Sequence, residues 1–235
     1  MWPFKKTQSL KDSGFFEGFT DYHSHILPGV DDGVRTMEES LEILSLYERL
    51  SIKAVWLTPH IMEDIPNTTE HLRERFEELK TACRGKITLH LASENMLDGL
   101  FEERLGKNDL LPVGTAGNHL LVETSYFYPP MDLYGILERI KAKGYYPVLA
   151  HPERYAYMKG EEYRRLKTMN VKFQLNLPSV CGMYGKEVQK KAEWMVKENM
   201  YNFIGNDIHS FSSLLKILSY CLQDRLENVC RKGME

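Results

Sequence analysis

Seven strand-like segments of this chain each end in a histidine, acidic or amide side chain, and this pattern constrains the fold more than any other feature. The segments are apolar, and they recur roughly every 25–37 residues, which is the spacing of alternating strands and helices. The first segment ends in a pair, His23 and His25, whose side chains point the same way along an extended strand. In chain order the segments span residues 19–25, 54–60, 87–94, 120–123, 146–151, 171–176 and 202–207.

Helical patterns fill most of the intervals between these segments. Apolar residues at helical spacing predict helices at about 36–50, 69–79, 133–144, 186–199 and 212–227. Thr36 and Glu39 have the spacing of a capping box, and Thr69 is the expected cap of the second helix. Alternating strands and helices predict an α/β protein with a parallel sheet and helices outside. A closed or nearly closed barrel fits the chain better than two domains, and chemistry in βα barrels lies at the carboxyl ends of the strands.

Composition narrows the class of protein further. The net charge is −3 and no basic stripe is present, which argues against nucleic acid as a partner. No apolar run approaches the ~18 residues of a membrane span, and the first residues lack the apolar core of a signal peptide. Together with four cysteines that show no CxxC spacing, these features predict a cytoplasmic protein with reduced thiols. We expect residues 1–18 to form an arm, whose Phe15 and Phe16 pack on a single domain of residues 19–235, and the oligomeric state is left open.

Several polar residues have simpler interpretations than a site. His71 is expected on a helix surface, His90 in the barrel wall, and His119 at the wrong end of its strand for chemistry. Gln174 and Asn176 reach the site or satisfy backbone groups, and the sequence does not decide between these roles. None of the cysteines (Cys83, Cys181, Cys221, Cys230) is followed by arginine at the spacing of a Cys-x5-Arg motif, so a cysteine-based tyrosine phosphatase is excluded.

Six motifs in order resemble the PHP (polymerase and histidinol phosphatase) superfamily. The most specific are the string His23-Ser-His-Ile-Leu-Pro-Gly-Val-Asp-Asp-Gly33 and the string Ala150-His-Pro-Glu-Arg154. The others are Thr58-Pro-His60, Glu94, Val122-Glu123 and Asn206-Asp-Ile-His209, and residues 179–186 resemble a further family segment. Within the superfamily, the chain is most similar to bacterial manganese-dependent protein-tyrosine phosphatases of capsule and exopolysaccharide biosynthesis. The resemblance extends over about residues 19–210.

This resemblance implies a distorted (β/α)7 barrel of the PHP type with three divalent metal ions, Mn²⁺ foremost and Fe or Zn²⁺ as alternatives. By position, the first metal would be held by His23, His25, Glu94 and Asp207; the second by Glu94, Glu123 and His151; and the third by Asp32, His60 and His209. Asp32 is the expected ligand of the Asp31-Asp32 pair, and Asp31 is its alternative. Arg154 matches a phosphate-binding arginine, and Arg154, His209 and Asp32 are the expected catalytic residues.

The implied reaction is hydrolysis of phosphotyrosine on a bacterial tyrosine kinase that governs polymer export, by attack of metal-activated hydroxide on phosphorus. We expect Tyr126 and Phe127, just after Glu123, to bind the substrate with Arg154, and Tyr128 to lie beside them. A phosphatase for a small molecule such as histidinol phosphate would use the same ligands and is the main alternative. Amidohydrolase-like chemistry lacks its strand-end lysine here, and a non-enzymatic scaffold ranks last. Relatives often carry a second arginine after the last motif, where this chain has residues 210–214, Ser-Phe-Ser-Ser-Leu.

Overall fold

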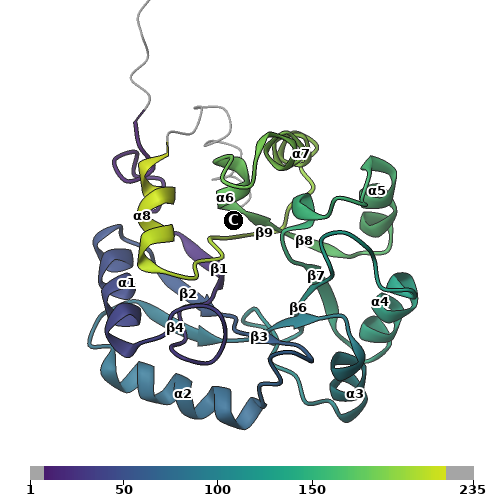
Figure 1. Cartoon of the computed structure of the whole chain (residues 1–235), viewed down its shortest axis with the longest axis horizontal. Helices are drawn as coiled ribbons and strands as arrows, with labels where there is room; N and C mark the ends of the chain where they lie inside the picture. Colours follow the sequence, from purple (N-terminus) through teal and green to yellow (C-terminus); the bar gives the residue numbers. More distant parts are fainter. Residues whose placement is uncertain (1–7, 221–235) are drawn as a thin grey trace, which may run out of the picture.

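The computed structural model describes residues 8–220 and is an α/β structure whose parallel strands curl round, with the helices outside them (Figure 1). The strands form a three-stranded sheet in the order β1-β2-β4 and a six-stranded sheet in the order β3-β5-β6-β7-β8-β9. Every paired strand is parallel to its neighbour. The predicted α/β class with a parallel sheet is therefore confirmed.

All seven predicted segments contain strands, but two of them are interrupted. The strands are β1 Thr20–Ser24, β2 Ala54–Leu57, β3 His60–Ile61, β4 Thr88–Leu91, β5 Glu94–Met96, β6 His119–Glu123, β7 Tyr146–Leu149, β8 Lys172–Asn176 and β9 Phe203–Gly205. Pro59 separates β2 from β3 because proline has no N–H to donate to a neighbouring strand. The neighbouring predicted segment, residues 87–94, is interrupted at the same level, between β4 and β5. Across this interruption Glu94 N–H still donates to Pro59 O at 3.1 Å. The two breaks divide the sheet into its two parts.

The free edge of the smaller sheet is hydrogen-bonded to the chain that follows β9. Asp207 N–H donates to His23 O at 2.8 Å, and His25 N–H donates to Ile208 O at 2.9 Å. The first and last predicted strand ends therefore lie side by side, although most of the chain separates them in sequence.

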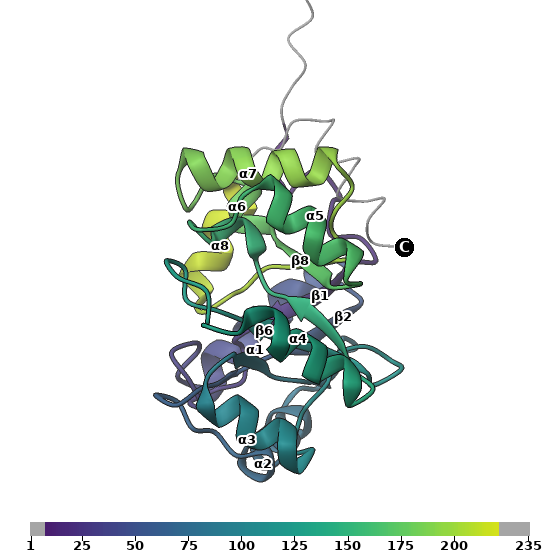
Figure 2. The ribbon, with the colours of Figure 1, turned by 90° about the vertical axis from the view of Figure 1, so that its right-hand side faces the viewer.

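Residues 8–220 contain eight α-helices and one short 3-10 helix. They are α1 Met37–Arg49, α2 Thr69–Ala82, α3 Gly99–Lys107, α4 Leu133–Ala142, α5 Gly160–Thr168, α6 Leu177–Val180, α7 Lys186–Lys197, α8 Phe211–Ser219 and η1 Pro152–Arg154. In the view of Figure 2, α7 lies at one end of the molecule and α2 and α3 at the other. The predicted helix at 212–227 corresponds to α8 as far as it is described, since residues 221–227 lie outside the described part. Within residues 8–220, no helix has the length and apolar character needed to cross a membrane.

The helix caps differ from the prediction in two details. Thr36 caps α1 by accepting from Glu39 N–H at 3.2 Å, but the Glu39 carboxylate accepts from Phe211 N–H at 2.9 Å instead of completing the box. Thr68, not Thr69, caps α2, because Thr68 has the extended backbone that a cap requires. The Thr69 hydroxyl donates to Asp109 instead.

The described part of the N-terminal arm is packed onto the rest of the chain. Phe15 and Phe16 are fully buried, and their rings meet edge to face at 5.1 Å between centroids. Leu10 N–H donates to Tyr220 O at 2.7 Å, which ties the arm to the end of α8. Trp2 and Phe4, two further aromatic residues of the arm, lie outside the described residues.

A buried polar network secures the contact between β1 and the end of β9. The Asp21 carboxylate accepts from Tyr47 OH at 2.7 Å and from Asn206 N–H at 2.9 Å. Burial raises the pKa of Asp21 to about 6, although the hydrogen bond from Tyr47 acts in the opposite direction. A folded-state pKa above the usual 3.8 means that this group stabilises the fold below pH ~4 and that its contribution is lost as the pH rises through ~6.

We predict that Tyr47→Phe destabilises the metal-free protein more at pH 8 than at pH 5. At pH 8 the variant loses a hydrogen bond to a charged carboxylate, which is worth about 1.5–3 kcal/mol, and at pH 5 only a neutral one of about 0.5–1.5 kcal/mol. Urea unfolding at both pH values measures the difference. Tyr163→Phe is the control, because Tyr163 OH donates to the neutral Pro152 O at 2.8 Å. Equal losses for Tyr47→Phe at both pH values would contradict a charged Asp21 in the folded protein at pH 8.

Candidate metal centre

The first strand supplies two histidines to one buried point. His23 and His25 are fully buried, and their Nε2 atoms lie 3.1 Å apart. The two side chains converge because residues two apart on an extended chain point to the same face. This is the arrangement that the His-x-His spacing predicts.

Glu94, the first residue of β5, lies against four histidines. Its Oε2 is 3.1 Å from His23 Nε2 and 3.3 Å from His25 Nε2. The same oxygen is 3.2 Å from His60 Nδ1, and Oε1 is 2.9 Å from His151 Nε2. The side chain is completely buried, so Glu94 is the common neighbour of imidazoles from three different strand ends.

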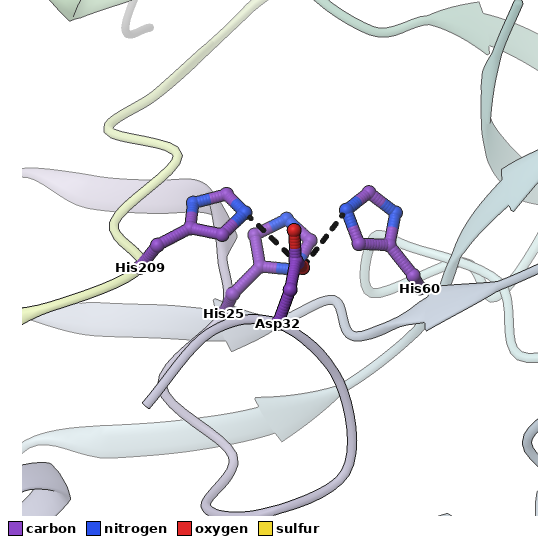
Figure 3. Close-up of side chains that lie close together, drawn as sticks. All are labelled: His25, Asp32, His60 and His209. Carbon is purple, nitrogen blue, oxygen red and sulfur yellow. Dashed lines mark ion pairs between the residues drawn. The ribbon is translucent and has the colours of Figure 1, made fainter. Parts of the chain in front are cut away.

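Nine histidine and acidic residues form four overlapping groups, each able to hold a metal ion. Within each group the ligand atoms all lie within 4.8 Å of one another. The groups are His25, Asp32, His60 and His209; His23, His25 and Asp207; His23, Glu94 and His151; and His60, Glu94 and Glu123. Figure 3 shows the first group, in which Asp32 lies between His60 and His209, at 3.6 Å and 3.7 Å from their Nε2 atoms.

The structure brings together all nine residues that were predicted as metal ligands. Asp32, His60 and His209 share a group as expected, and His25 joins them. His23 is shared between the group of His25 and Asp207 and the group of Glu94 and His151, while Glu123 groups with His60 and Glu94. None of the four groups includes the histidines set aside in the sequence, His71, His90 and His119. His90 instead stacks on Trp56 at 4.4 Å between ring centroids.

The donor atoms fit divalent metal ions. His60 Nδ1 and Glu123 Oε1 are buried and lie 3.1 Å apart, but neither makes a well-directed hydrogen bond among the described residues. Buried polar atoms are almost always paired, so two such atoms facing each other in this cluster favour a bound ion as the missing partner. Mixed imidazole and carboxylate ligands suit Mn²⁺, Fe or Zn²⁺.

Without metal, the histidines and carboxylates of the cluster stabilise each other's charged forms. Burial of His23 acts to lower its pKa, but Glu94 and Asp207 outweigh burial and raise it to about 9. Burial of Glu94 acts to raise its pKa, but His23 and His60 outweigh burial and hold it well below the usual range. The same balance of burial against His23 lowers the pKa of Asp207. Metal ions would therefore replace protons on the histidines when they bind.

A second layer of side chains orients these ligands. The side chain of Asp31 is buried and accepts from His25 Nδ1 at 2.8 Å and from His60 N–H at 3.0 Å. The two neighbouring carboxylates thus have different contacts: Asp32 lies near His60 and His209, whereas Asp31 holds the ring of His25. Such contacts set which ring nitrogen of a histidine faces a metal.

Gln174 performs the same task for two other ligands. Its Oε1 accepts from His23 Nδ1 at 2.9 Å and from His151 N–H at 3.1 Å. His151 has φ of 31°, a left-handed conformation that costs a histidine about 1 kcal/mol or more, and the bond to Gln174 helps to hold it. The alternation of β8 places Gln174 and Asn176 on one face, which is the signal in the sequence for this role.

Arg154 lies beside the cluster at the end of η1. Its Nη1 donates to Asp207 Oδ2 at 3.0 Å, and Asn176 Nδ2 donates to the same oxygen at 2.7 Å. The guanidinium carbon is 4.3 Å from the ring centroid of Tyr126 and 4.3 Å from that of Tyr184. Tyr126, expected to bind substrate, thus contacts Arg154, whereas Phe127 is 68% exposed. The sequence assigned no role to Tyr184.

Comparison with known proteins supplies the family. The family model for capsular polysaccharide synthesis, CpsB/CapC, matches residues 19–228. The chain belongs to this family. Among curated CpsB/CapC relatives, tyrosine-protein phosphatase YwqE from Bacillus subtilis is 28% identical over 81% of this chain and 77% of its own length. Tyrosine-protein phosphatase CpsB from Streptococcus pneumoniae is 27% identical over 82% of this chain and 84% of its own length.

A solved structure of the CpsB/CapC type has the same fold. It comes from work on YwqE from Bacillus subtilis and CpsB from Streptococcus pneumoniae, described there as metal-dependent tyrosine phosphatases. It superposes with a TM-score of 0.76 over 91% of this chain and 87% of the other, at 24% sequence identity.

We predict that Gln174→Met weakens metal retention while the protein stays folded. Methionine is similar in size but has no strong acceptor for His23 and His151, and loss of such a partner costs about 10- to 100-fold in metal affinity. Metal content at graded chelator concentrations, with circular dichroism on the same samples, measures the effect. Gln189→Met is the control, since Gln189 donates to Val180 O at 2.9 Å. Unchanged retention in Gln174→Met would rule out an orienting role.

Proposed function

We propose that this chain is a metal-dependent protein-tyrosine phosphatase that removes phosphate from a tyrosine kinase of polysaccharide biosynthesis. The observation that carries this proposal is the position of Arg154. Its guanidinium is 3.0 Å from Asp207 Oδ2, while Asp207 itself belongs to a cluster of potential metal ligands. A positively charged side chain that can bind phosphate is thus paired with a carboxylate of the candidate metal site. Membership of the CpsB/CapC family and the names of its curated relatives support the same activity.

The nine clustered residues are the proposed metal ligands, and Mn²⁺ is the proposed metal. When bound, divalent ions at such a site neutralise phosphate oxygens and lower the pKa of a bound water. Glu94 would contribute to more than one ion site, because its two carboxylate oxygens face different histidines. Asp31 and Gln174 would keep the correct ring nitrogens of His25 and His23 turned toward the ions.

Asp32, His209 and Arg154 are the proposed catalytic residues because they form the accessible side of the cluster. The side chains are 65%, 33% and 18% exposed, whereas those of His23, His25 and Glu94 are fully buried. A phosphate group would enter at this side and accept hydrogen bonds from the Arg154 guanidinium, which is always charged. This chain has no arginine in residues 210–214, so Arg154 would carry most of the phosphate binding.

The proposed finer description of the fold is a distorted (β/α)7 barrel of the PHP type, forming one domain over residues 19–235. The hydrogen bonds between residues 207–208 and β1 support it, because they join the last strand-bearing segment to the first. In such a barrel the active site lies at the face formed by the carboxyl ends of the strands and the connections that follow them.

The main alternative, a phosphatase for a small molecule such as histidinol phosphate, would use the same cluster. The ligand set does not distinguish these substrates, because both present a phosphate monoester. The curated CpsB/CapC relatives are tyrosine-protein phosphatases, and this favours the protein substrate.

We predict that metal-stripped protein regains phosphotyrosine hydrolysis when Mn²⁺ is added back. Phosphate release from a phosphotyrosine peptide is compared with release from a phosphoserine peptide and from histidinol phosphate. Glu94→Ala is the control that should lose both metal and turnover. Selective release from histidinol phosphate would overturn the protein substrate, and release without added metal would overturn the metal dependence.

We also predict that Arg154→Ala lowers kcat/KM for phosphotyrosine by about 10- to 150-fold, which corresponds to one charge-assisted hydrogen bond of about 1.5–3 kcal/mol. Steady-state kinetics with metal content measured in parallel tests this, because Asp207 keeps its hydrogen bond from Asn176 in the variant and metal content should therefore fall less than kcat/KM. Arg139→Ala is the control, since Arg139 is ion-paired to Glu102 and Asp132 on the surface. Wild-type kcat/KM in Arg154→Ala would remove its role in phosphate binding.

A further inference from the structure

Arg154 is held by three parts of the chain that are distant in sequence. Tyr126 comes from the connection after β6, and Tyr184 from the connection between α6 and α7. Both ring centroids are 4.3 Å from the guanidinium carbon, a distance at which the ring face attracts a cation. Asp207, after β9, accepts from Nη1 at 3.0 Å and fixes the end of the side chain.

These contacts restrain the guanidinium and leave most of its donors available. An arginine side chain has five N–H donors. Among the described residues, Asp207 is the only acceptor of a hydrogen bond from this guanidinium. Aromatic rings restrain a guanidinium without consuming its N–H groups, because the contact uses the face of the ring. The remaining donors can therefore bind an anion at low entropic cost.

We propose that Tyr184, together with Tyr126, is a positioning residue that holds Arg154 ready for the phosphate group of the substrate. This inference rests on the proposed phosphatase function and assigns a role to a residue outside the metal cluster. Tyr126 then acts through Arg154 rather than by stacking on the ring of the substrate. Phe127 and Tyr128, which are 68% and 76% exposed, are the aromatic side chains left to contact the rest of the substrate.

Tyr184 affects binding of phosphate in this proposal, not the metal ions, and this makes it testable. Tyr184→Ala releases one side of the guanidinium, so KM for a phosphotyrosine peptide and the inhibition constant of inorganic phosphate should both rise by about 3- to 30-fold. The value of kcat should fall less than KM rises. Tyr184→Phe keeps the ring face and should restore both constants to within about twofold of the wild type.

The decisive comparison places Tyr184→Ala in the Arg154→Ala background. If the tyrosine acts through the arginine, it should cause no further rise in either constant once the arginine is gone. Tyr134→Ala is the matched control, because the Tyr134 ring lies 3.7 Å from the guanidinium carbon of Arg165, a different arginine. This control should leave KM and phosphate inhibition unchanged. Metal content and the unfolding midpoint are measured for every variant.

Three outcomes would overturn the inference. The first is an equal effect of Tyr184→Ala with and without Arg154, and the second is a loss confined to kcat or to the unfolding midpoint. In both cases the wild type hydrolyses phosphotyrosine, so the proposed function stands. The third is absence of phosphotyrosine hydrolysis by metal-loaded wild type, which would overturn the proposed function and this inference with it.

Discussion

The contact of Glu94 with four imidazoles is the interaction on which the rest of the structure depends. A fully buried carboxylate is costly unless charges and hydrogen bonds compensate it. Here the compensating histidines come from the end of β1, the start of β3 and the chain just after β7, so these three places must meet at one point. Pairing of His60 with Glu94 across β3 and β5 sets one of these contacts directly through the sheet register. The electrostatics of the cluster and the curl of the sheet are therefore two aspects of one arrangement.

The strand ends could be predicted because two independent signals coincide there. Apolar runs locate the strands, and a ligand-type residue at the end of each run locates the edge at which parallel strands meet. The breaks at Pro59 and before Glu94 were not predicted: Pro59 was placed inside a single strand although proline cannot donate to a neighbouring strand, and the residues before Glu94 carry no comparable signal. The predicted cap of α2 was wrong by one residue. Thr68 and Thr69 have the same side chain, and only the backbone angles distinguish them.

Residues that act through others were harder to predict than the ligands themselves. Asp31 and Asp32 are neighbours in a turn, and composition alone does not say which is buried. The structure separates them by what they contact: Asp31 bonds to the His25 ring and to the His60 backbone, while Asp32 faces two histidines from the exposed side. Gln174 was left undecided because an amide serves backbone and side-chain groups equally well, and here Oε1 serves one of each. Tyr184 had no periodic signal, because it lies in a connection.

The division between strands and connections has a consequence for how such a site can change. His23, His60, Glu94 and Glu123, four of the nine proposed metal ligands, lie in strands, and the backbone N–H groups of His25 and Asp207 are hydrogen-bonded across the contact between β1 and the chain after β9. Arg154, Tyr126 and Tyr184 belong to connections, and so do the exposed Phe127 and Tyr128. Connections tolerate substitution better than strands because fewer of their backbone groups are paired within a sheet. Changes in the connections can therefore alter which phosphate ester reaches the cluster while the ligands remain in place, so substrate choice and metal binding are separable properties of this chain.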